Sequence, residues 1–257
     1  MSDSSVDFIP TSAMVIVAHP DDAEFMVAGT VAKWARSGCE VTYVVITKGD
    51  KGSEDPDMTP ELLTEIREAE QRAAGTVLGV KHYEFMGYPD AYLQHTLELR
   101  RDVTRLIRKY QPEVVMTFDP SERFFGDNYP NHPDHRAAGD VAIDAVFPSA
   151  RDRLTFPELL AEGLAPHKVA QIWLSSPGPK CNIWIDIGET LALKQEALLK
   201  HPSQLGPDIG EFAVQMARWG AEGQPFEFGE AFRRIILDQP PGPPSEKVPE
   251  SAEYVAD

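Results

Sequence analysis

Two short segments of the sequence, HPDD and HPDH, combine histidine with aspartate at spacings that suit a metal ion. His19 and Asp22 are three residues apart, and so are His132 and His135. An i, i+3 pair lies on one side of a turn or first helical turn, so each segment can direct two ligand atoms to one point. Two imidazoles and one carboxylate leave the fourth position of a tetrahedral ion open, which is typical of catalytic zinc rather than structural zinc.

Each segment also carries one further carboxylate, Asp21 in the first and Asp134 in the second. A bound metal lowers the pKa of its water to about 7. A carboxylate beside that water can take its proton and later return it to a leaving group. Taken alone, each segment is more typical of a turn that begins a helix than of a metal site. The hydrolytic interpretation therefore depends on the two segments meeting in space.

The elements around the two segments predict that they meet. Residues 13–18 (AMVIVA) form an unbroken apolar run typical of a strand buried on both faces, and His19 follows this run directly. Residues 113–118 (EVVMTF) resemble such a strand too, and an aromatic-rich loop at 119–131 leads from them to His132. In a doubly wound sheet, two such strands can be neighbours where the strand order reverses, and ligands bind outside their carboxyl ends.

The remaining chain alternates strands with helices. Further strands are predicted at 40–47, 82–86, 168–175 and 182–187, and helices at 22–37, 59–78, 96–110, 133–146 and 189–200. This alternation predicts an α/β fold: a Rossmann-like, doubly wound, mostly parallel sheet with helices on both faces. We expect a single domain over residues 13–238, an N-terminal segment at 1–12, and a Pro-rich tail at 239–257 that is flexible or drapes over the domain.

The charge balance excludes several classes of partner. The 257 residues include 24 Lys and Arg against 41 Asp and Glu, which gives a formal net charge of −17. Such a chain repels nucleic acids and anionic membrane surfaces, because no basic run segregates the positive charge. No apolar run approaches the roughly 20 residues of a membrane span, and no signal peptide or cysteine cluster is recognisable. We therefore expect a cytoplasmic protein with neither a nucleic-acid nor a membrane partner.

The motifs resemble those of the PIG-L/LmbE-like family of zinc-dependent N-deacetylases, of the N-acetylglucosaminyl deacetylase type. The resemblance is close to whole-chain, and its two metal motifs are specific as a pair. The similar segments are AHPDDAEF at 18–25, R-x-x-E with LGV at 67–80, GYPD at 87–90, HPDHR at 132–136 and KQEALLKHPSQ at 194–204.

The resemblance implies a metal site with an adjacent base. His19, Asp22 and His135 would be the ligands of Zn²⁺, although Fe²⁺ or another divalent ion suits imidazole and carboxylate as well. Asp21 would be the general base that activates the zinc-bound water, and then the acid that protonates the departing amine.

Further roles are implied around this centre. His132 would stabilise the oxyanion, and Asp134 would orient His132. Arg67 and Asp90 would hold the sugar hydroxyls. From the residues alone, Arg67 is equally typical of a salt-bridged helix surface, and Asp90 of a turn.

Two more residues are candidates for substrate contact on their own properties. Tyr129, in the aromatic-rich loop, could stack on a sugar face, or it could pack against the aromatic rings of its own loop. His201, at the end of a predicted helix, could reach the substrate, or it could satisfy the terminal carbonyl groups of that helix.

The function that we expect is removal of an N-acetyl group from an N-acetylglucosamine-type sugar or sugar conjugate, giving a free amine and acetate. One alternative is an amidase that cleaves a larger acyl group or a thiol-sugar conjugate at the same site. A non-catalytic metal-binding scaffold is disfavoured, because such a scaffold would not need Asp21 or His132. A metal phosphoesterase is disfavoured because such sites usually hold two metals and more carboxylates. A homo-oligomer is compatible with the sequence.

Overall fold

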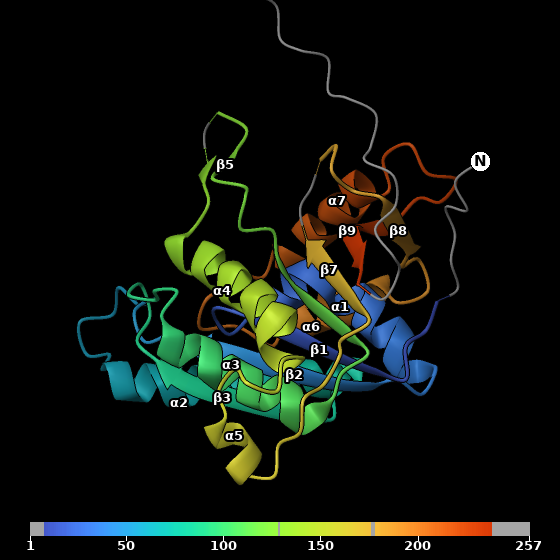
Figure 1. The fold of residues 1–257 in the computed structure, drawn as a ribbon. Helices are drawn as coiled ribbons and strands as arrows, with labels where there is room; N and C mark the ends of the chain where they lie inside the picture. The colour runs from blue at the N-terminus through green and yellow to red at the C-terminus, as the bar shows by residue number, and fades with distance from the viewer. Residues whose placement is uncertain (1–7, 128, 176–177, 238–257) are drawn as a thin grey trace, which may run out of the picture.

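A seven-stranded sheet forms the centre of the computed structural model, which describes residues 8–127, 129–175 and 178–237 (Figure 1). The strand order is β3-β2-β1-β4-β7-β9-β8. Pairing is parallel from β3 through β7, and β9 is antiparallel to both of its neighbours. The predicted α/β class with a mostly parallel sheet is therefore confirmed. The tail predicted at 239–257 lies outside the described residues.

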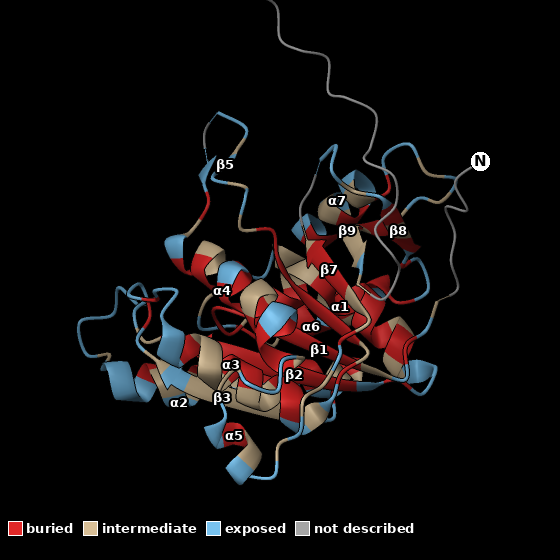
Figure 2. Cartoon of the chain, viewed as in Figure 1, coloured by how far each residue is buried: buried red, intermediate tan, exposed pale blue. Residues whose placement is uncertain are grey.

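Apart from β9, which was not predicted, the strands of the main sheet agree closely with the predicted ranges. They are β1 (Ser12–Val17), β2 (Glu40–Thr47), β3 (His82–Tyr88), β4 (Val114–Phe118), β7 (Gln171–Ser175), β8 (Ile183–Asp186) and β9 (Gly229–Ile236). Every residue of β4, and every residue of β1 except the first, is buried, as the red strands in Figure 2 show. The apolar runs thus form the centre of the core.

Helices cover both faces of the sheet. They are α1 (Asp22–Arg36), α2 (Pro60–Leu78), α3 (Leu97–Tyr110), α4 (Pro133–Asp144), α5 (Glu158–Ala161), α6 (Leu191–Leu198) and α7 (Ile209–Gly220). Helices α1, α2 and α6 pack together on one face, whereas α3 and α4 pack together on the other (Figure 1). None of the described helices is long and apolar enough to span a bilayer.

Local signals explain where α2 begins and ends. The Thr59 side chain accepts a hydrogen bond from the N–H of Leu62, and Pro60 occupies the first helical position. Gly79 ends the helix with a φ of 85°, a conformation that costs glycine little. The position of this helix matters for the site, because its buried face carries Arg67.

Several elements differ from the prediction. The helix predicted at 133–146 ends at Asp144 and continues as a π-helical turn, η1 (Ala145–Ala150). The loop predicted at 119–131 contains a short hairpin of β5 (Phe124–Phe125) and β6 (Tyr129–Pro130). The sequence analysis missed α5, α7 and β9. Strand β9 lacks an apolar run because it carries a buried glutamate, Glu230, and two arginines.

That glutamate belongs to a buried ion pair that joins the sheet to two helices. Lys194 Nζ on α6 lies 2.7 Å from Glu230 Oε1, and the two residues are 2% and 5% exposed. The Glu230 carboxylate also accepts the backbone N–H groups of Gly29 and Thr30 on α1, and Lys194 donates to the carbonyl oxygen of Phe25. The pair therefore ties α1, α6 and β9 together.

Replacing Lys194 by methionine is expected to lower the free energy of unfolding by about 3–5 kcal/mol, because Glu230 would remain buried without its counter-ion. Urea denaturation measures the loss. Lys200→Met is the matched control, since it removes a lysine whose pair with Glu196 is exposed; we expect it to cost at most about 1 kcal/mol. Equal losses in the two variants would show that the buried pair is not important for stability.

Candidate metal centre and active site

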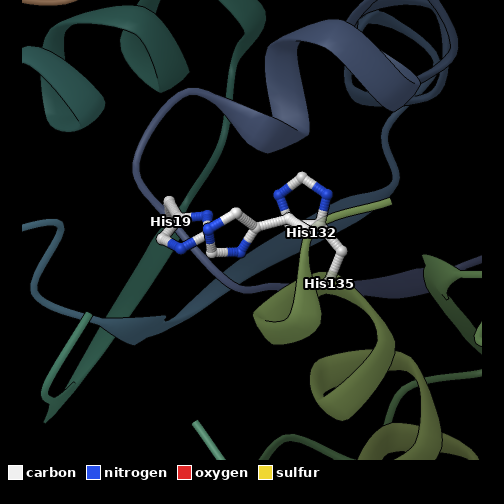
Figure 3. A group of neighbouring side chains, drawn as sticks. All are labelled: His19, His132 and His135. Atoms are coloured by element: carbon white, nitrogen blue, oxygen red, sulfur yellow. The ribbon is translucent and has the colours of Figure 1, made fainter. Parts of the chain in front are cut away.

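Three histidines converge outside the carboxyl ends of β1 and β4. These two strands are hydrogen-bonded neighbours at the point where the strand order reverses, which is where ligands bind in doubly wound sheets. His19 follows β1, whereas His132 and His135 lie at the start of α4. Their ring centroids are 4.8–5.2 Å apart, and Figure 3 shows the three side chains gathered between the two segments. The predicted meeting of the two motifs is therefore observed.

Asp22 lies between two of these rings. Its Oδ2 is 3.3 Å from His19 Nδ1, and its Oδ1 is 3.1 Å from His135 Nε2. Two ligand atoms bound at 2.0–2.1 Å to one tetrahedral zinc ion are roughly 3.3 Å apart. The two separations from Asp22, each measured to a different carboxylate oxygen, are therefore of the size found between ligands of one metal ion. A donor nitrogen of each of His19, His132 and His135 lies within 4.8 Å of those of the other two, so His132 is a further possible donor.

Two carboxylates lie next to Nε2 of His19. His19 Nε2 lies 3.0 Å from Asp90 Oδ1 and 3.4 Å from Asp134 Oδ2. Neither contact has the geometry of a hydrogen bond, and His19, Asp90 and Asp134 together form a second cluster that could hold a metal ion. Asp90 is predicted to hold sugar hydroxyls and Asp134 to orient His132; both carboxylates lie next to His19, and the two roles stay predictions.

The electrostatics of this cluster favour a cation. Burial lowers the pKa of His19, but Asp22 above all, with Asp134 and Asp90, raises it to about 12. Burial acts to raise the pKa of Asp22, yet His135 and His19 hold it far below its usual range. The buried carboxylates therefore stabilise positive charge between them, which is a property that a divalent metal would satisfy.

His132 is held in one tautomer by the start of α4. Its Nδ1 accepts the backbone N–H of Asp134 at 3.2 Å, as the side chain of the helix N-cap. The pKa of His132 is lowered by burial and by the neighbouring His19 and His135. A neutral ring whose Nδ1 accepts a hydrogen bond must carry its proton on Nε2. The free Nε2–H can therefore donate to an oxygen in the site.

Asp134 connects α4 to the loop after β3. Its carboxylate accepts the backbone N–H groups of Ala91 and Leu93 at 2.8 and 3.2 Å, and its side chain is fully buried. Asp134 therefore holds this loop against α4, and with the loop it holds Asp90 in place beside His19.

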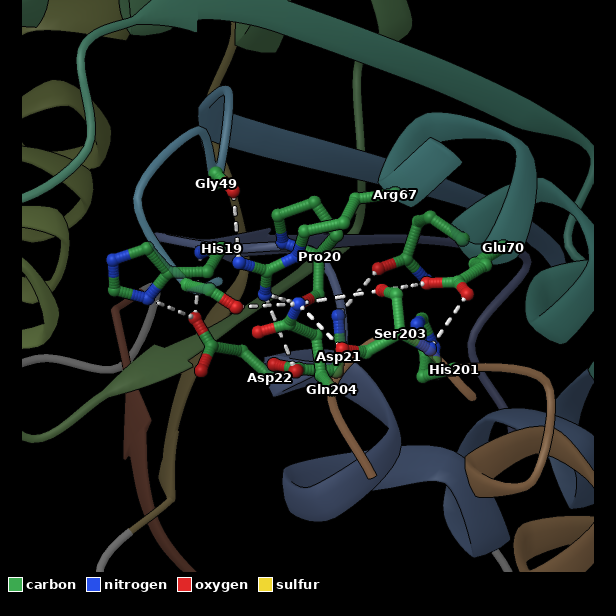
Figure 4. A network of polar contacts seen from close by, with 12 residues as sticks. His19, Pro20, Asp21, Asp22, Gly49, Arg67, Glu70, His201, Ser203 and Gln204 are labelled. Atoms are coloured by element: carbon green, nitrogen blue, oxygen red, sulfur yellow. Dashed lines mark hydrogen bonds and ion pairs between the residues drawn. The ribbon is translucent and has the colours of Figure 1, made fainter. Parts of the chain in front are cut away.

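Asp21 occupies an unusual backbone conformation next to a buried guanidinium. Its φ is 97°, in the left-handed region that residues other than glycine rarely adopt. Arg67 Nη2 lies 3.3 Å from Asp21 Oδ2 and donates to the carbonyl oxygen of Pro20, and Arg67 Nη1 donates to that of Gly49 (Figure 4). Arg67, predicted to bind sugar hydroxyls, is 5% exposed and holds the base candidate through these contacts.

The Asp21 carboxyl is suited to exchanging protons near neutral pH. Burial and the adjacent charge of Asp22 raise its pKa to about 7, and the positive charge of Arg67 only partly opposes this shift. A general base is most effective when its pKa lies near the working pH.

The last two predicted residues make no hydrogen bond, ion pair or ring contact with the three histidines within the described structure. His201 is completely buried, with Nε2 3.3 Å from Glu24 Oε2, so its ring offers no surface to a substrate. Tyr129 lies on the β5–β6 hairpin, 57% exposed, with its ring 6.1 Å from that of Phe125. The hairpin projects from the body of the domain (Figure 1). Contact between Tyr129 and a substrate stays a prediction.

One residue of the site escaped the sequence analysis although its position carried a signal. Phe118 is the last residue of β4, and its ring stacks on that of His135 with centroids 4.3 Å apart and an interplanar angle of 6°. An aromatic side chain at the carboxyl end of a strand beside the switch point is well placed to orient a neighbouring histidine. Phe118 therefore packs flat against one face of the His135 ring.

A mostly parallel α/β sheet, with a His/Asp cluster and a buried carboxyl at its switch point, defines a class of candidate metal-dependent hydrolases. Within that class, the chain can be assigned to one family. Residues 14–146 match the family described as PIG-L, GlcNAc-PI de-N-acetylase, and the chain belongs to this family.

Several relatives match most of the chain. It is 32% identical over 198 residues to diacetylchitobiose deacetylase of Thermococcus kodakarensis, spanning 77% of this chain and 72% of the relative. It is 31% identical over 203 residues to a probable N-acetyl-alpha-D-glucosaminyl L-malate deacetylase 2 of Bacillus anthracis, spanning 77% and 83%. The solved structure of N,N′-diacetylchitobiose deacetylase from Pyrococcus horikoshii, in complex with its inhibitor MPG, matches with a TM-score of 0.80 and 32% identity, over 88% of this chain and 84% of that one.

Proposed function

We propose that this protein is a metal-dependent N-deacetylase that removes the acetyl group from an N-acetylglucosamine-type sugar or sugar conjugate. The products are a free amine and acetate. The observation that supports the proposal is the cluster of His19, Asp22 and His135, to which Asp21 is adjacent in sequence, in a chain of the GlcNAc-PI de-N-acetylase family. Relatives named as deacetylases of acetylated sugars support the substrate class.

His19, Asp22 and His135 would hold the metal, and we propose Zn²⁺ as the ion. When bound, it would supply a Lewis acid that polarises the acetyl carbonyl and acidifies water. Three protein ligands leave a position open for water or substrate, as in catalytic zinc sites. Asp90 and Asp134 would fix the His19 ring, and Phe118 would fix that of His135.

Asp21 would perform the proton transfers. In its ionised form the carboxylate would accept a proton from the attacking water, and it would then deliver that proton to the nitrogen of the departing amine. Arg67 would keep the carboxylate oriented during both steps. His132 would donate its Nε2–H to the carbonyl oxygen as negative charge develops there, which is the contribution of an oxyanion hole.

Acetate release tests the proposed function. Protein with its metal in place is incubated with N-acetylglucosamine, N,N′-diacetylchitobiose and a panel of N-acetylglucosamine conjugates, before and after treatment with a chelator. We expect release from at least one member, loss of release on chelation, and recovery on addition of Zn²⁺. The same panel with longer N-acyl groups tests for cleavage of larger amides. Release that survives complete removal of the metal would contradict the metal-dependent mechanism.

A further inference from the structure

A glutamine on α2 lies against the backbone of the proposed base. Gln71 Oε1 accepts the N–H of Asp21 at 2.9 Å. Gln71 lies four residues after Arg67, so the two side chains share one face of the helix. One holds the carboxylate of Asp21 and the other holds its peptide N–H. Helix α2 therefore holds both the backbone N–H and the side-chain carboxylate of Asp21.

The other end of the same amide is anchored in a buried polar network. Gln71 Nε2 donates to both oxygens of Glu24, at 2.9 and 3.0 Å, and Glu24 Oε2 lies 3.3 Å from His201 Nε2. Gln71, Glu24 and His201 are all completely buried. Because Nε2 is committed to Glu24, the amide cannot rotate without losing both contacts, and its oxygen stays directed at Asp21.

The conformation of Asp21 needs such an anchor. A non-glycine residue at a φ of 97° persists only where its surroundings hold it. The conformation also separates the roles of two adjacent residues, because Asp22 faces the histidines while Asp21 faces Arg67. Without the hydrogen bond from its N–H, the Asp21 peptide would be free to relax toward an ordinary turn, and the carboxylate would move with it.

We propose that Gln71 is a positioning residue for the deacetylation, acting through the backbone of Asp21 and anchored by Glu24. The inference rests on the proposed function, because Asp21 is the base of that reaction. The hydrogen bonds of the Gln71 side chain go to Asp21 and Glu24, not to the proposed metal ligands. It affects the rate because a base displaced by about 1 Å loses on the order of 100-fold in rate.

Two substitutions separate positioning from stability. Gln71→Met keeps the length of the side chain but removes both the acceptor and the donor. Gln71→Glu keeps an acceptor for the Asp21 N–H, while it places a second buried carboxyl against Glu24 and so destabilises the fold. We expect kcat to fall by about 10- to 100-fold in Gln71→Met, with KM and metal content within about threefold of the parent. We expect kcat to be higher in Gln71→Glu than in Gln71→Met, although the melting temperature of Gln71→Glu is expected to be no higher than that of Gln71→Met.

Two control variants are matched to these substitutions. Lys194→Met is destabilised through the pair with Glu230, and Lys194 makes no hydrogen bond or ion pair with Asp21 or Gln71 within the described residues. Glu70→Gln changes the adjacent residue of α2, which holds Ser203 and makes no recorded contact with Asp21 within the described structure. Both controls are expected to keep kcat per folded molecule. If kcat in the Gln71 variants simply follows melting temperature, as in Lys194→Met, or stays at the parent value, the positioning role is overturned.

An activity-independent measurement separates this proposal from the proposed function. Backbone hydrogen exchange of the segment that contains Asp21 is expected to quicken in Gln71→Met and to remain slow in Glu70→Gln. If the parent protein binds metal but releases no acetate, the proposed function fails, while the exchange result still reports whether Gln71 holds Asp21. Unchanged exchange in Gln71→Met would overturn the positioning role whatever the activity.

Discussion

Asp21→Asn is expected to lower kcat by about 100- to 10,000-fold while leaving the metal content unchanged, because an amide cannot accept the proton of the attacking water. Asparagine has nearly the shape of aspartate and tolerates left-handed backbone better than most residues, so the φ of 97° can be kept. The remaining rate would come from the metal ligands and from His132. Steady-state kinetics of acetate release, with metal analysis of the same samples, measures both quantities.

The matched control for this substitution is Asp55→Asn. Asp55 is exposed in the loop that precedes α2, where its carboxylate accepts the backbone N–H of Asp57. The control removes the same charge, and its kcat is expected to stay within twofold of the parent value. Near-parent turnover in Asp21→Asn would exclude Asp21 as the base, and a loss of metal in that variant would show that Asp21 helps to hold the ion.

Asp22→Asn is expected to abolish metal binding, and activity with it. The carboxylate of Asp22 contacts His19 and His135 with separate oxygens, and it also accepts the backbone N–H of His19 at 2.7 Å. Loss of an outer partner of a metal ligand already costs about 10- to 100-fold in affinity. Loss of a charged ligand is expected to cost more, because the two imidazoles would then have no anionic partner between them.

Thermal unfolding with and without added Zn²⁺ reads out this loss directly. A metal present at 100 times its Kd stabilises the folded state by about 2.7 kcal/mol, which raises the Tm of a chain of this size by about 5–10 °C. The parent protein and Asp21→Asn should both show this rise, whereas Asp22→Asn should not. A parent-like rise in Asp22→Asn would mean that the ion is held by another set, with the three histidines as the first candidate.

Opposite results in these adjacent residues would separate two functions that the sequence places side by side. The first motif predicts a metal ligand and a base at adjacent positions, but it does not show how the two side chains can face different partners. In the structure, the backbone conformation separates the two side chains. Asp22 begins α1 and points to the histidines, whereas Asp21, with its backbone in the left-handed region, points to α2. Gln71 and Arg67, which hold Asp21 there, come from a helix that is far along the chain from both metal motifs.

The sequence by itself determined the fold class and the meeting of the two motifs. Apolar runs specify buried strands through composition alone, and helix α2 begins and ends at residues with strong local preferences, Thr59 and Gly79. The neighbouring positions of β1 and β4 then follow from the reversal of strand order that doubly wound sheets share. Because these signals are local or topological, they required no knowledge of side-chain packing.

Only the tertiary structure decided what each polar side chain faces. Asp90 and Asp134 turn to His19, Arg67 turns to Asp21, and His201 is buried against Glu24. These contacts join segments that are far apart in the chain, so they depend on how α2, α4 and the loop after β3 pack around the carboxyl ends of the strands. Spacing in the sequence shows which residues can reach one site, but the partner of a buried carboxylate is decided by atoms a few ångströms away, and only packing brings those atoms there.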